Sequence, residues 1–156
     1  MAGEESEGGP GPAVVLDTNT VISALIRGEG PTRRIILLTA KIYPSYTVPQ
    51  LLKEIERHNS FLEEKKGIPR EKLVSLLDIL LMDVKLVEPE EEALKEAVGF
   101  TRDPGDKHFV ALALELRRRY REVVILTYNK RDYLQEELSG RGIRVMAPPE
   151  FAAEYL

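Results

Sequence analysis

The sequence contains no cysteine, and this absence excludes several classes of site at once. Disulfide bonds, thiolate metal ligands and thiol nucleophiles all require that residue. Only two histidines are present, which also disfavours a zinc site built on imidazole ligands. We therefore expect any metal centre in this chain to use oxygen ligands, which select hard ions such as Mg²⁺ or Mn²⁺.

Long hydrophobic runs and an excess of basic residues are missing as well. No apolar stretch approaches the roughly 20 residues that cross a bilayer, and the first residues are acidic and rich in glycine and proline, unlike a signal peptide. We expect a cytoplasmic protein with no membrane partner. A net charge of −4 argues against a broadly basic surface, so phosphate contacts are expected to be local or carried by metal ions.

What is present fits one folded domain. A chain of 156 residues with 43% hydrophobic residues is long enough to bury a sizeable core, but short for two domains. Residues 1–12 combine glycine, proline and glutamate with nothing to bury, which predicts a flexible N-terminal tail. The single domain is therefore expected to span residues 13–156.

The order of sequence patterns predicts an α/β fold. Apolar runs predict strands at residues 13–16, 42–46, 84–87, 123–126 and 143–146. Helical periodicity and capping residues predict helices at about 20–27, 31–40, 47–58, 69–82, 90–99, 106–120 and 131–139, and a short one from 148. This alternation predicts a three-layer sandwich, with a mostly parallel central sheet of four to five strands and helices on both faces.

Polar residues follow two of the predicted strands directly. Asp17 ends the first strand, and the segment Thr127 to Asp132 follows the strand at 123–126. Ligands of such sheets bind at the carboxyl ends of the strands, which makes these positions the first candidates for a site. Each acid alone is equally explained as part of a helix start, with Asp17 as a cap.

Two further acids lie outside the strand ends. Asp106 closes the turn Asp103-Pro-Gly-Asp106, which places two carboxylates within three residues, although a helix cap explains it too. Glu54 lies on a predicted helix between Leu52 and Ile55, where a solvated glutamate is the usual outcome. These acids indicate a functional site only when all of them are considered together.

Taken in order, four segments resemble the motifs of the PIN domain: VVLDTNTVISALI, LLKEI, DKHFVALA and TYNKRDY. The resemblance runs from residue 13 to about residue 151, and it extends to the small VapC-type toxins of prokaryotic toxin–antitoxin pairs. It implies a PIN-like three-layer fold. It also implies an endoribonuclease that leaves a 5′-phosphate and a 3′-hydroxyl.

The same resemblance implies roles for particular residues. Asp17, Glu54 and Asp106 match the first three acids, which are catalytic and hold the metal. The fourth position is open, because many relatives have an aspartate two residues after the threonine, where this chain has Asn129. Asp132 offers a catalytic carboxylate three residues later, while Asn129 could still bind a metal through its carbonyl oxygen or a water.

Elementary electrostatics supports a metal at such a site. Several carboxylates that converge on one pocket repel one another and stay ionised only if cations neutralise them. Mg²⁺ or Mn²⁺ can activate a water for attack on a phosphodiester and stabilise the leaving oxygen. Single-stranded or structured RNA would then need positive charge around the acids, and Arg102, Lys107, Lys130 and Arg131 are the candidates to hold its phosphates. Asn19 and Thr127 are further substrate-binding candidates, through their polar side chains. Tyr128 and Tyr133 could stack on a base, although packing is the more usual role for Tyr133.

Several functions remain open on these grounds. The first is a Mg²⁺- or Mn²⁺-dependent toxin with a cognate antitoxin protein and a homodimeric state, and a housekeeping RNA-processing nuclease is a variant of it. The second is a non-catalytic PIN-fold module for RNA binding or assembly, which Asn129 favours. A haloacid-dehalogenase-like phosphatase ranks last, because that family expects an aspartate two residues after Asp17, where this chain has Asn19.

Overall fold

The computed structural model describes residues 11–27 and 30–156. Most of the predicted flexible tail, residues 1–10, therefore lies outside the described residues. Pro12, the last residue assigned to that tail, is buried. The described end of the segment predicted to be a tail is therefore packed against the fold.

A single sheet of five parallel strands forms the centre of the fold, in the order β3-β2-β1-β4-β5. This confirms the predicted α/β class. The strands are β1 (Ala13–Leu16), β2 (Ser45–Thr47), β3 (Val84–Leu86), β4 (Val123–Leu126) and β5 (Ile143–Met146). Every residue of the two central strands, β1 and β4, is buried, which explains why both read as continuous apolar runs.

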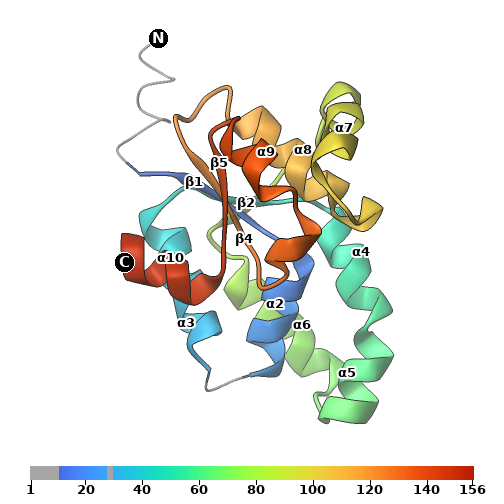
Figure 1. The fold of residues 1–156 in the computed structure, drawn as a ribbon. Coiled ribbons are helices and arrows are strands. Elements are labelled where there is room, and N and C mark those ends of the chain that lie inside the picture. Colours follow the sequence, from blue (N-terminus) through green and yellow to red (C-terminus); the bar gives the residue numbers. More distant parts are fainter. Residues whose placement is uncertain (1–10, 28–29) are drawn as a thin grey trace.

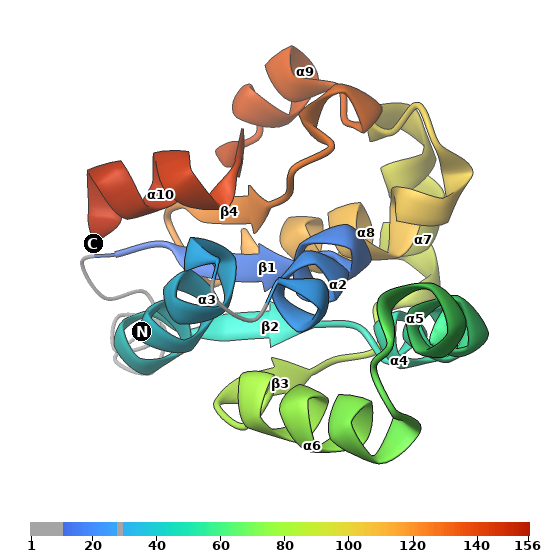
Figure 2. The same ribbon diagram turned by 90° about the horizontal axis from the view of Figure 1, so that it is seen from below.

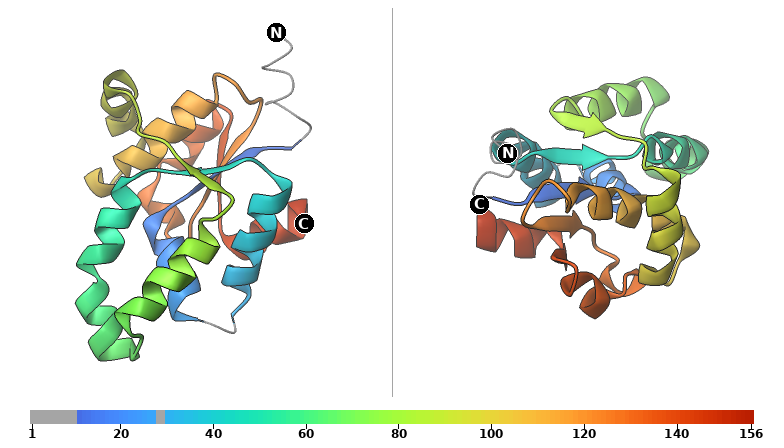
Figure 3. Two further views of the ribbon diagram at one scale, coloured as in Figure 1. Left: turned by 180° about the vertical axis from the view of Figure 1, so that it is seen from behind. Right: turned by 90° about the horizontal axis from the view of Figure 1, so that it is seen from above.

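Helices cover the sheet on both faces, as Figures 1 and 2 show. The α-helices are α2 (Thr18–Ile26), α3 (Pro31–Ile42), α4 (Gln50–Arg57), α5 (Asn59–Lys66), α6 (Arg70–Leu80), α7 (Glu91–Ala97), α8 (Lys107–Leu116), α9 (Gln135–Ser139) and α10 (Pro148–Tyr155). Helices α7 and α8 lie on one face, and α2 and α3 lie on the other (Figure 3). Helix α9 packs beside the edge strand β5, and α10 packs against α3. Three 3-10 helices complete the described part, at Val98–Phe100, Pro104–Asp106 and Lys130–Asp132.

Several predicted boundaries were wrong, and local geometry explains them. The strand expected at 42–46 is Ser45–Thr47, because α3 continues through Ile42 before the chain extends. The helix expected to end near His58 is followed at once by α5, which ends at Gly67 in the left-handed region with a φ of 67°. The helix expected at 106–120 is shorter and ends at Leu116.

The segment expected to be one helix from 131 to 139 is divided in two. The 3-10 helix Lys130–Asp132 comes first, and α9 starts only at Gln135. Tyr133 between them is extended, with a φ of −110°, and forms an antiparallel bridge with Thr101. Burial of the Tyr133 side chain, which is 1% exposed, is what interrupts the helix.

The strand order places a switch point between β1 and β4. From β1 the chain moves outward to β2 and β3, and then returns to the other side of β1 to form β4. In open parallel sheets, a crevice forms at the carboxyl ends of the strands where the order reverses. Among the described residues, no helix combines the length and the apolar character needed to cross a membrane.

Candidate functional site

The two central strands deliver Asp17 and Thr127 to the switch point. Leu16 pairs with Leu126, so the next residue of each strand lies at the same edge of the sheet. Both side chains are buried, with Asp17 1% exposed and Thr127 fully covered. The strand patterns place each residue at the carboxyl end of its strand, and the two ends meet because the strands are parallel and paired in register.

Both carboxylate oxygens of Asp17 have hydrogen-bond donors. The backbone N–H of Thr20 donates to Oδ1 at 3.0 Å, which makes Asp17 the N-cap of α2, and the Tyr133 hydroxyl donates to Oδ2 at 3.3 Å. Burial raises the pKa of Asp17, while hydrogen bonds from Thr127, Thr20 and Tyr133 act to lower it. Asp17 therefore caps α2 and also places a carboxylate at the end of β1, so a structural role and a role in the site do not exclude each other.

Glu54 reaches the site from α4, the helix that follows β2. Its Oε1 accepts a hydrogen bond from the hydroxyl of Thr18, the residue directly after Asp17. The side chain is half-buried rather than solvated, in contrast to the usual behaviour of glutamate on a helix. Because β2 lies beside β1, the start of α4 is brought next to the start of α2.

Asp103, Asp106 and Asp132 form a tighter acidic group. One carboxylate oxygen from each lies within 4.8 Å of the others, and this is the spacing expected of groups that can share a metal ion. Backbone contacts hold the two contributing loops together, since the Arg102 N–H donates to the Asp132 carbonyl at 2.8 Å beside the Thr101 bridge. Asp103 was not among the predicted ligands, although the turn that contains it was recognised.

The electrostatics of Asp106 connects this group with the other two acids. Burial, which is the largest cause, and the negative charges of nearby acids together raise the pKa of Asp106 to about 7. In decreasing order of effect, these acids are Asp17, Asp103, Asp132 and Glu54. Asp17 and Glu54 are not members of the tight group, yet both are close enough to affect its central residue. The structure thus brings the four predicted acids close enough to interact electrostatically: Asp17, Glu54 and Asp132 each raise the pKa of Asp106.

The donor set fits a hard divalent cation. The ligand atoms are carboxylate oxygens, and the raised pKa of Asp106 shows that the group is hard to ionise fully without a positive charge. Tyr133 remains a hydrogen-bond donor, because burial and the charge of Asp17 hold its pKa well above the ordinary value. A bound cation would relieve the repulsion that this arrangement creates.

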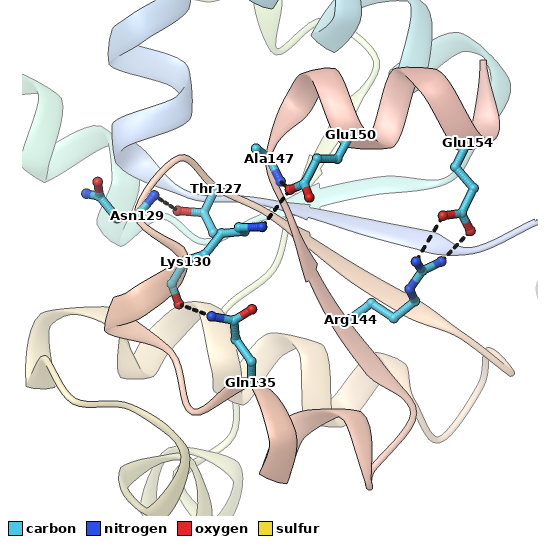
Figure 4. A network of polar contacts seen from close by, with 8 residues as sticks. All are labelled: Thr127, Asn129, Lys130, Gln135, Arg144, Ala147, Glu150 and Glu154. Carbon is cyan, nitrogen blue, oxygen red and sulfur yellow. Dashed lines mark hydrogen bonds and ion pairs between the residues drawn. The ribbon is translucent and has the colours of Figure 1, made fainter.

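Asn129 is not part of the tight acidic group and lines a separate hollow. Its backbone N–H donates to the Thr127 hydroxyl at 3.0 Å, and Figure 4 shows its amide pointing away from the side chain of Lys130. Together with Asn19 it lines a hollow of about 350 Å³ beside α2. We call this the α2 hollow, and its lining residues are Asn19, Ser23, Arg27, Tyr128 and Asn129.

The basic residues predicted to bind RNA phosphates do not all lie in one place. The Nζ of Lys130 donates to Glu150 on α10 at 2.8 Å (Figure 4). Arg102 is exposed and donates from Nη1 to the carbonyl of Arg131 at 2.7 Å, so these two lie together beside the loop of Asp132. Lys107 is half-buried at the start of α8, directly after Asp106.

A known protein-family model matches about two thirds of the chain. The family model described as PIN domain matches residues 15–118, which extend from β1 to the residues just after α8. The match includes Asp17, Glu54, Asp103 and Asp106, whereas Asp132 lies beyond it. Comparison with curated proteins finds none that matches the chain.

Proposed function

This chain belongs to the PIN domain family, whose members are generally nucleases, and on that basis we propose that it is a Mg²⁺- or Mn²⁺-dependent endoribonuclease. The observation that carries the proposal is the meeting of acidic side chains from separate segments at the switch point of the sheet. Carboxylates in such number at one crevice are costly for folding. A role in binding cations explains why the fold retains them.

We assign the metal to the tight acidic group. Asp103, Asp106 and Asp132 would hold the ion, with Asp17 and Glu54 adding negative charge around it. Asp132 rather than Asn129 then fills the fourth position, because its carboxylate lies in the group. When bound, a divalent cation supplies positive charge at the phosphate and lowers the pKa of a water molecule.

The remaining residues orient the acids and the substrate. Tyr133 and the Thr20 N–H fix the carboxylate of Asp17, and Thr18 fixes that of Glu54, so that neither must reorganise during the reaction. Arg102, Lys107 and Arg131 lie beside the acidic loops and provide the positive charge that RNA phosphates on either side of the cut bond require.

Cleavage of a single-stranded RNA with and without Mn²⁺ tests the proposal. We expect cutting that depends on Mn²⁺, is stopped by EDTA and falls more than about 100-fold in Asp17→Asn, because the uncharged amide weakens the field that holds the metal. Asp78→Asn is the matched control, since Asp78 is exposed on α6. Cleavage that survives EDTA, or that Asp17→Asn leaves intact, would contradict the proposal.

A second candidate is a PIN-fold module that binds RNA without cutting it. Asn129 favours it, because this position carries an aspartate in many relatives. Calorimetric titration with Mn²⁺ separates the two candidates. The nuclease binds the ion and loses affinity in Asp106→Asn, whereas the module binds RNA and shows no such metal dependence.

The toxin role, a cognate antitoxin and a homodimer stay predictions from the resemblance, as does the housekeeping alternative. A small gene for a DNA-binding protein next to the gene for this chain would support the toxin role. Light scattering of the purified protein would measure its oligomeric state.

A further inference from the structure

We propose that the α2 hollow binds one unpaired nucleobase of the substrate, next to the bond that is cut, and prefers guanine. The inference rests on the proposed function, since it takes single-stranded RNA as the ligand. It concerns residues that the acidic group does not use. Its basis is the position, the chemistry and the size of the hollow.

Two chain segments connect the hollow to the acids. Asp17 starts α2, and Asn19 lies two residues further on, in the hollow. Asp132 ends the 3-10 helix that Asn129 precedes, and the Asp132 N–H donates to the Asn129 carbonyl at 3.0 Å. One 3-10 turn advances by about 6 Å. A nucleotide next to the cut bond therefore needs to reach only a short distance to enter the hollow.

Tyr128 gives the hollow an aromatic surface. Its side chain is 40% exposed, although the two residues before it, Leu126 and Thr127, are fully buried. The hydroxyl contacts that of Thr32 on α3, which fixes the edge of the ring. An exposed ring that is held in place is the usual platform on which a single-stranded base stacks.

The other lining residues provide hydrogen bonds to a base edge. Asn19 and Asn129 each offer an amide, Ser23 a hydroxyl and Arg27 a guanidinium, and none of the described lining residues is acidic. The hollow is therefore richer in donors than in acceptors. On its Hoogsteen edge guanine presents the neighbouring acceptors O6 and N7, which a guanidinium can bind as a pair, whereas the corresponding edge of cytosine presents an amino donor.

The size of the hollow suits one base. A volume of about 350 Å³ lies at the lower end of the range for small-molecule sites. A base that is already unpaired enters such a site without the cost of leaving a duplex. This size and the single aromatic ring favour single-stranded RNA over a double helix.

The test is the binding of a labelled U-rich RNA with one guanine, measured by fluorescence anisotropy with Ca²⁺ in place of Mn²⁺ to slow cleavage. We expect Tyr128→Ala to weaken binding about 5- to 150-fold, the range typical of one lost base stack. Replacing the guanine by an abasic site should weaken wild-type binding similarly, with little further loss in Tyr128→Ala. Arg27→Ala should reduce the preference for guanine over cytosine.

Two matched controls and one rescue variant accompany these changes. Phe61→Ala removes another exposed ring, on α5, and Arg121→Ala removes an exposed arginine before β4, and both should bind RNA as wild type does. Tyr128→Phe restores the ring and should restore binding. A loss of affinity in Tyr128→Ala that Tyr128→Phe does not restore would assign the effect to the Thr32 contact and overturn base stacking.

Cleavage mapping separates this inference from the nuclease proposal. If the protein cuts RNA in Mn²⁺ but Tyr128→Ala and Arg27→Ala leave affinity and cutting pattern unchanged, the inference fails and the nuclease stands. If RNA binding depends on Tyr128 and guanine but no cutting occurs, the base site stands and the nuclease fails.

Discussion

Asp17 shows how one side chain can serve the fold and the proposed chemistry together. It caps α2 through one oxygen and receives the Tyr133 hydroxyl on the other. These donors partly offset the cost of burying the carboxylate, which by itself raises the pKa of Asp17. The donors around Asp17 are therefore expected to set the pH at which the site becomes active.

Replacing Tyr133 by phenylalanine tests that expectation. The hydroxyl lowers the pKa of Asp17, so its loss raises that pKa and moves the acid limb of the rate–pH profile to higher pH. Tyr133 is buried, and the lost hydrogen bond should also cost about 1 kcal/mol of unfolding free energy. The profile and a denaturant titration measure the two effects.

Tyr43→Phe is the matched control for this change. The Tyr43 hydroxyl donates to the carbonyl of Tyr155 at 2.8 Å, on the α10 side of the molecule. A similar loss of stability with an unshifted pH profile is expected. An unshifted profile in Tyr133→Phe as well would show that this hydroxyl does not tune the site.

At the level of elements, the connections between helices and strands decide where side chains point. The bridge between Thr101 and Tyr133 holds the loop of Asp106 against that of Asp132. Two glycines also shape connections, since Gly67 and Gly142 have φ angles of 67° and 79°. Only glycine adopts this left-handed region without strain.

Substitution of these glycines by alanine should destabilise the protein to different degrees. At Gly67 an added Cβ meets nothing within 4 Å, so only the backbone penalty of about 1–2 kcal/mol applies. At Gly142 the added atom would lie 2.0 Å from the Arg117 Nε, so the guanidinium must also move, and the loss should be larger. Thermal or urea unfolding measures both.

Gly99→Ala is the control, because Gly99 has no positive φ and no atom within 4 Å of an added Cβ. Its stability should stay unchanged or rise by less than about 1 kcal/mol. Equal losses at Gly67 and Gly142 would show that the contact with Arg117 costs nothing.

For the whole molecule, the acidic crevice makes stability depend on both pH and cations. Asp106 has a folded-state pKa of about 7, against an ordinary value of 3.8. The metal-free folded protein thus holds a proton that the unfolded chain releases. The stabilisation that this bound proton gives to the folded state is complete below pH 3.8 and is lost as the pH rises through about 7.

Melting curves at pH 5 and pH 8, in EDTA or in Mn²⁺, test this dependence. We expect Mn²⁺ to raise the melting temperature more at pH 8, where the carboxylates are ionised and repel one another. At a concentration 100 times its Kd, the ion should add about 2.7 kcal/mol. Mn²⁺ that stabilises equally at both pH values would argue against binding at this group.

Asp106→Asn provides the opposite behaviour for comparison. In EDTA at pH 8 it should be more stable than wild type, because one repelling charge is gone, and Mn²⁺ should stabilise it far less. A variant that is less stable than wild type in EDTA would mean that Asp106 has a structural role.

Much of the architecture was predictable because its causes are local in the sequence. Apolar runs identify β1 and β4, and the residue after each such run must lie at the carboxyl edge of a parallel sheet. The predicted positions of Asp17 and Thr127 at this edge are therefore confirmed. The interruption of the helix expected at 131–139 was not predictable in this way, because it depends on the packing of the Tyr133 side chain into the core.

The sequence by itself determined the chemistry available to this protein, because residue types exclude thiol sites and leave oxygen ligands. Only the tertiary structure decided which acids meet. Glu54 turns inward because α4 starts beside α2. Asp132 meets Asp103 and Asp106 because the Thr101–Tyr133 bridge and the hydrogen bond from Arg102 to Asp132 hold the two loops together. Such orientations depend on packing between segments distant in the chain, which no local pattern encodes.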